Sequence, residues 1–132
     1  MKVLTRDEIL AAGGTRIEKV PLPSGQGHVA IRALPTRVFW DLGKWQVERG
    51  KDADSAIEAM LKMVALTVVD EDGRPLFDET SPKDMKALWS LDIKLIRYLF
   101  KEAERIAGVT EDDVQRAMAN LSDGQSGNSS TT

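Results

Sequence analysis

Few side chains in this sequence are of a type that does chemistry. His28 is the only histidine, and the chain contains no cysteine. Disulfides, thiolate metal sites and cysteine nucleophiles are therefore excluded, and a Ser-His-Asp triad would have to use His28. No serine lies in the turn that presents a nucleophile, and His28 directly follows a run of turn-forming residues. We expect His28 to be a strand residue beside a turn and the protein not to be an enzyme.

The acidic segment 70–79 is the best candidate for a metal site. In the register of an EF-hand loop, suitable residues fall at positions three, five, six and twelve: Asp70, Asp72, Gly73 and Glu79. Position one is Val68, which cannot bind a cation, and Pro75 lies inside the loop. The segment therefore predicts a turn and not a calcium loop. The glycines match neither GxxxxGK[ST] nor GxGxxG, so no cofactor is expected.

Length and composition indicate a single globular domain. The chain has 132 residues, 42% hydrophobic and 30% charged, with a net charge of −3. No apolar run approaches the ~20 residues of a membrane helix, and acidic residues occupy the N-terminal segment where a signal peptide would be apolar. We expect a cytoplasmic protein that binds neither membrane nor nucleic acid, because its overall charge is acidic.

The N-terminal third predicts a short helix followed by a β-hairpin. Thr5 and Glu8 form a capping box for a helix over residues 5–12. Two strands follow within residues 16–34, joined by the Pro- and Gly-rich turn 23–27. Pro21 indicates that the first strand lies at an edge of the sheet.

The remainder of the chain predicts helices over about 36–49, 55–69, 82–107 and 111–121. The helix at 55–69 is apolar almost all round, which indicates a central position, and its β-branched end can continue as extended structure. The helix at 82–107 either continues or bends near Ser90. Its expected core stripe is Leu88, Leu95, Leu99, Ala103 and Ile106, flanked by Trp89, Ile96 and Phe100.

The expected fold class is therefore α+β: a mostly α-helical single domain, residues 1–121, with an N-terminal β-hairpin packed on a helical layer. Residues 122–132 contain no apolar side chain and are expected to form a disordered tail.

Exposed apolar side chains suggest where a partner protein would bind. In the helix at 36–49, Val38, Leu42 and Trp45 form one stripe, while Trp40 and Val47 point to the opposite side. Trp40 and Val47 either form a partner-binding patch or pack between the hairpin and the helical layer. A short apolar anchor follows the acidic turn. The candidate partner-binding residues are Trp40, Val47, Leu76 and Phe77.

Four basic residues recur on one side of the helix at 82–107: Lys94, Arg97, Lys101 and Arg105. Glutamates 102 and 104 lie close to them, so a solvated face of mixed charge is expected. The alternative is a DNA-binding transcriptional regulator that uses the C-terminal helices, which would require a basic surface around a recognition helix.

Three blocks in order resemble the small tail assembly chaperones of long-tailed bacteriophages and prophages. The first is residues 4–12, LTRDEILAA, followed by a hairpin that ends in residues 29–34, VAIRAL. The second is residues 65–77, ALTVVDEDGRPLF, and the third is residues 103–114, AERIAGVTEDDV. The resemblance covers residues 3–121. The ending of the chain departs from the family pattern, because a Ser/Gly tail follows Ser122.

The resemblance implies an assembly factor and not an enzyme. Such chaperones bind the tape-measure protein and keep it soluble while the tail is built in the host cytoplasm, and they are absent from the virion. Self-association and contacts with other tail proteins are further expected interactions. A translational frameshift often extends such chaperones, and the unusual ending puts that extension in doubt here. A structural minor tail component is a further alternative.

Overall fold

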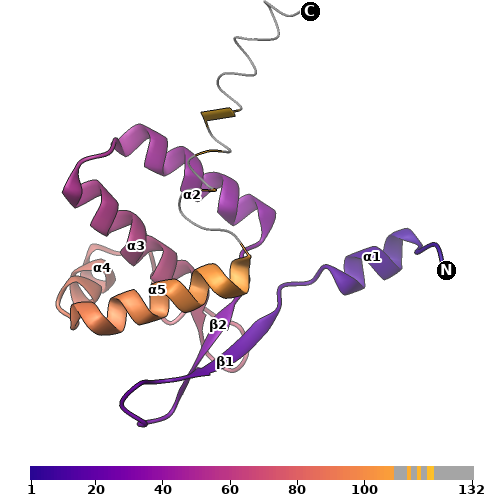
Figure 1. Cartoon of the computed structure of the whole chain (residues 1–132), viewed down its shortest axis with the longest axis horizontal. Helices are drawn as coiled ribbons and strands as arrows, with labels where there is room; N and C mark the ends of the chain where they lie inside the picture. Colours follow the sequence, from indigo (N-terminus) through magenta and orange to yellow (C-terminus); the bar gives the residue numbers. More distant parts are fainter. Residues whose placement is uncertain (109–112, 114–115, 117–118, 121–132) are drawn as a thin grey trace, which may run out of the picture.

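The computed structural model describes residues 1–108, 113, 116 and 119–120, and Figure 1 shows the arrangement. The elements follow one another as α1 (Arg6–Ala12), β1 (Ile17–Pro21), β2 (His28–Arg32), α2 (Thr36–Arg49), α3 (Ala53–Thr67), β3 (Val68–Val69), α4 (Pro82–Trp89) and α5 (Ile93–Ala107). The α+β prediction is confirmed, as a single small domain.

The strands form one antiparallel sheet in the order β1-β2-β3. Val20 pairs with Val29 across β1 and β2, and Ile31 pairs with Val68 across β2 and β3. Val20, Ile31 and Val68 are all buried, and they belong to the same core as buried residues of α5. The sheet therefore buries one face against helices, as the predicted packing of the hairpin requires. Pro21 lies on the edge strand β1, as predicted.

Helix α3 is the central element, as its nearly continuous apolar surface predicts. It contacts α2, α4, α5 and β3. Helix α5 crosses the buried side of the sheet, where the Tyr98 hydroxyl donates to the Pro21 carbonyl and Arg16 donates to the Ile106 carbonyl at 2.5 Å. Arg32 of β2 donates to the Leu66 carbonyl at the end of α3, at 2.7 Å. These bonds join the hairpin to both helices.

Two predicted helix boundaries are wrong. Helix α3 begins one residue after Asp52, whose carboxylate accepts the Ser55 N–H at 2.7 Å, and not at residue 55. It ends at Thr67, because Val68 and Val69 pair with β2 as strand β3. The pairing explains the β-branched sequence there, for which extended structure is a predicted alternative.

The segment 82–107 bends near Ser90, one of the two predicted alternatives, and forms two helices. Helix α4 ends at Trp89, and the Asp92 side chain starts α5 by accepting the Lys94 N–H at 2.7 Å. The break changes which side chains are buried. Trp89, expected to flank the core, is 48% exposed, and Ile96 replaces Leu95 as the buried residue of the first turns of α5.

Helix α1 lies apart from the other elements (Figure 1). The predicted capping box is confirmed, because the Thr5 hydroxyl accepts the Glu8 N–H and the Glu8 carboxylate accepts the Thr5 N–H. No residue of α1 is buried. Its stability therefore comes from local bonds and not from packing.

The predicted tail, 122–132, and most of the predicted helix 111–121 lie outside the described residues. Within the described part of the chain, no helix is long and apolar enough to cross a membrane.

Candidate partner-binding groove

Helices α2 and α3 leave a hollow between them that the segment after β3 partly closes. Its volume is about 160 Å³, and its lining residues are Val38, Asp41, Leu42, Trp45, Lys62, Leu66 and Glu79. Leu42 is buried, but Val38 and Trp45 are only half-buried. The apolar stripe predicted for this helix is therefore buried at Leu42 and forms the wall of a hollow at Val38 and Trp45.

A second hollow of about 300 Å³ adjoins the first. Its lining residues are Ala65, Leu66, Pro75, Phe77, Asp78 and Glu79. Leu66 and Glu79 line both hollows, so together they form one surface, which we call the α2–α3 groove. Its floor is apolar, and Phe77 packs against the core while part of its side chain remains accessible.

A partly buried ion pair lies where the two hollows meet. The Lys62 ammonium contacts the Glu79 carboxylate at 2.5 Å, with side chains 18% and 26% exposed. The same ammonium lies 4.9 Å from the centroid of the Trp45 ring, within cation–π range. Lys62 thus connects the segment after β3 to both helices and helps to hold the groove in shape.

The rim of the groove is acidic. Asp41, Asp78 and Glu79 contribute carboxylates, whereas Lys62 is the one cation among the lining residues. Hydrogen bonds from the side chain and then the backbone of Thr80 lower the pKa of Asp78 below its usual value. Asp78 therefore stays ionised at neutral pH, and the rim favours a ligand with positive charges beside its apolar surface.

The structure separates the four predicted partner-binding residues into three places. Phe77 lines the α2–α3 groove, but Leu76, its neighbour in sequence, is 55% exposed and lines another hollow beside the sheet. Trp40 and Val47 are 36% and 60% exposed and line neither part of the groove. Phe77 is therefore the one groove-lining residue that was predicted to bind a partner, and Trp45, Lys62 and Glu79 are among those that were not.

The hollow beside Leu76 contains two of the residues first considered for chemistry, His28 and Asp70. Lys19, His28, Ala30 and Asp70 are among its lining residues, and its volume is about 530 Å³. His28 begins β2 as predicted and is exposed. The Asp70 carboxylate accepts two backbone N–H groups of its own turn, so the predicted turn is confirmed. No three His, Cys, Asp or Glu side chains among the described residues are placed to hold one metal ion.

Comparisons of this chain with protein-family models, with curated proteins and with solved structures give no match.

Proposed function

We propose that this protein is a tail assembly chaperone that binds a helical segment of the tape-measure protein in the α2–α3 groove. The observation that carries the proposal is the apolar groove floor, formed by Val38, Trp45, Leu66 and Phe77, which remains accessible beside a well-packed core. A groove of this kind accepts the apolar stripe of an amphipathic helix. The identity of the partner rests on the sequence resemblance described above.

The charges on the rim specify the segment that would bind. Because Asp41, Asp78 and Glu79 surround the floor, the bound helix carries Lys or Arg beside its apolar stripe. Binding covers the apolar stripe, which otherwise promotes aggregation of a long helical protein. A chaperone role follows from this protection, and it requires no catalytic residue in this chain.

Co-expression with a tape-measure protein tests the proposal. We expect a soluble, stoichiometric complex on affinity pull-down and sizing, and an insoluble tape-measure protein when that protein is expressed alone. No complex, together with a tape-measure protein that is soluble by itself, would refute the proposal.

Matched variants locate the binding surface. Val38→Glu puts a charge at the half-buried wall of the groove, and we expect it to abolish the complex. Val47→Glu makes the same change on the other exposed side of α2, and we expect it to leave the complex intact. Loss of the complex with Val47→Glu alone would instead assign binding to the surface of Trp40 and Val47. Circular dichroism and thermal unfolding confirm that each variant is folded.

A further inference from the structure

The bend between α4 and α5 exposes three large apolar side chains within five residues. Trp89, Leu91 and Ile93 are 48%, 40% and 52% exposed, and we call them the α4–α5 corner. Backbone bonds from Ser90 to the Lys86 and Ala87 carbonyls end α4, and the Asp92 carboxylate caps α5. These bonds fix the bend, so the corner presents its apolar side chains as part of the folded structure.

The segment around the corner is basic in an acidic chain. Residues 82–101 contain five cations, Lys83, Lys86, Lys94, Arg97 and Lys101, and two acids, Asp84 and Asp92. Five minus two gives a local charge of +3, whereas the whole chain has −3.

Both acidic side chains of this segment accept hydrogen bonds from backbone N–H groups. The Asp84 carboxylate accepts the Asp78 N–H, and the Asp92 carboxylate accepts the Lys94 N–H, each at 2.7 Å. None of the five cations forms an ion pair with another described residue, whereas Arg105 further along α5 pairs with Glu18 and Glu102. The five cations next to the corner are therefore not held in ion pairs by the described residues.

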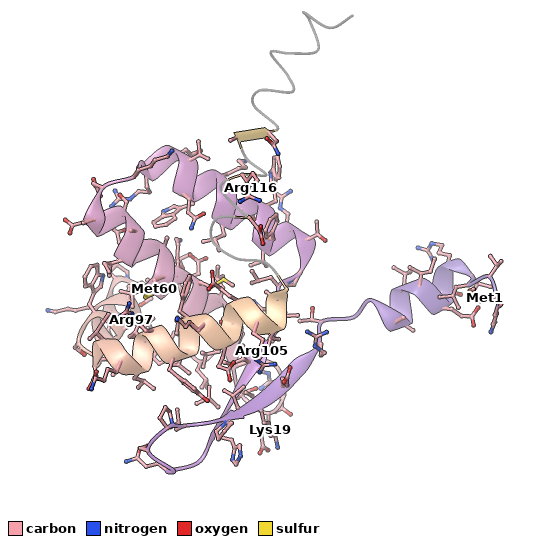
Figure 2. All side chains as sticks on the ribbon, in the orientation of Figure 1. Met1, Lys19, Met60, Arg97, Arg105 and Arg116 are labelled. Atoms are coloured by element: carbon pink, nitrogen blue, oxygen red, sulfur yellow. The ribbon has the colours of Figure 1, made fainter. Side chains whose placement is uncertain are left out.

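The cations and the apolar side chains are neighbours on their helices. Lys86 lies one turn before Trp89 on α4, and Arg97 lies one turn after Ile93 on α5. Figure 2 shows Arg97 in the part of α5 nearest to α4. The corner thus combines an apolar centre with a basic border, the reverse of the acidic rim of the α2–α3 groove.

We propose that the α4–α5 corner is a second docking surface, and that it binds an amphipathic helix of a partner protein with Asp and Glu beside its apolar stripe. Charge complementarity selects this occupant. The phosphates of a nucleic acid would contact the cations of this protein, but Leu91 and Ile93 would then have no apolar partner. A membrane surface needs a long apolar stripe, and the corner offers three side chains.

The proposal is tested with two labelled peptides of about 18 residues, each with Leu on one helical face. One peptide has Glu on the other face, and the second has Lys. Fluorescence anisotropy against the full chain should show binding of the Glu peptide that weakens with added salt. The Lys peptide should not compete with it.

Variants assign this binding to the corner. Lys94→Glu with Arg97→Glu should weaken binding of the Glu peptide about tenfold or more, since two attractive contacts become repulsive. Lys51→Glu with Arg74→Glu, exposed positions in turns, makes the same change in net charge and should have little effect. Trp89→Ser should weaken binding without reducing its salt dependence.

Three results would overturn the proposal. The first is equal weakening by the two double variants, because net charge would then explain binding. The second is absence of binding of the Glu peptide at low salt. The third is tighter binding of a labelled DNA duplex or of anionic phosphatidylserine vesicles that Lys94→Glu with Arg97→Glu abolishes, because those ligands would then be the occupant. If Lys94→Glu with Arg97→Glu fails to fold, Lys86→Glu on α4 tests the same border.

Discussion

Replacing Lys62 by methionine tests whether its contacts hold the α2–α3 groove together. Methionine keeps an apolar chain of similar length over the Trp45 ring but removes the charge. The variant therefore loses the ion pair with Glu79 and the cation–π contact, with little change in packing.

The expected loss follows from the burial of the pair. Exposed ion pairs contribute about 0.2–1 kcal/mol, and breaking a buried pair costs about 3–5 kcal/mol. At 18% and 26% exposure, the Lys62–Glu79 pair lies between these cases, and we expect a coupling energy of about 1 kcal/mol. The cation–π contact adds about 0.5–1 kcal/mol. Lys62→Met should therefore reduce the free energy of unfolding by about 2 kcal/mol, equivalent to about 6 °C in Tm.

A double-mutant cycle with Lys62→Met and Glu79→Gln, followed by urea unfolding, measures the coupling directly. The control is the Arg37–Asp41 pair on α2, whose side chains are 80% and 54% exposed and whose coupling should stay below about 0.5 kcal/mol. A Lys62–Glu79 coupling below about 0.3 kcal/mol would refute the view that this pair fixes the segment after β3 against the helices.

Three further predictions concern the core, a helix end and α1. Ile31→Ala should cost about 3–4 kcal/mol in urea unfolding, because Ile31 is fully buried, whereas Ile17→Ala, at a 43% exposed position, should cost less than about 1 kcal/mol. Gly108→Ala should lower the Tm through strain at φ +74° and not through a clash, since a Cβ there meets no atom within 4 Å; an unchanged Tm would contradict this. A hydrogen bond from Lys2, followed by bonds from Thr5, lowers the pKa of Glu8 below its ordinary value of 4.5. The contribution of ionised Glu8 to the stability of α1 is therefore complete above pH 4.5 and is lost as the pH falls through the lowered pKa. Backbone chemical shifts should report this loss in α1 alone.

Local signals in the sequence predicted the elements whose ends depend on local bonds. The capping box of Thr5 and Glu8 located α1, and the turn cluster at 23–27 located the hairpin. The start of α3 was placed wrongly because Asp52, Asp54 and Ser55 are all good N-caps, and only the fold decides among them.

The break between α4 and α5 was predicted only as one of two alternatives, although the sequence contains a signal for it. Asp92 is a strong N-cap, but the apolar residues on both sides keep a helical spacing, which favoured a single helix. On a continuous helix Trp89 would flank the core, and it was therefore expected to be buried there. The bend instead directs Trp89 toward solvent.

The groove could be predicted only in part. Periodicity grouped Val38, Leu42 and Trp45, and the apolar anchor identified Phe77. The missing information was tertiary, since the meeting of Lys62 with Glu79, 17 positions apart, depends on the path of the chain after β3. Helical periodicity reports which face of a helix is apolar, but it does not report how completely another element covers that face.

The order of the sheet has a consequence for folding kinetics. Ile31 and Val68 pair across β2 and β3 although they are 37 positions apart, with α2 and α3 between them. Closing a flexible loop of that length costs about 3 kcal/mol plus a constant, whereas helices form locally within about a microsecond. Formation of the α2–α3 helical pair shortens the loop before the third strand joins. We therefore expect α2 and α3 to be formed in the transition state, and β3 to pair on the native side of the barrier.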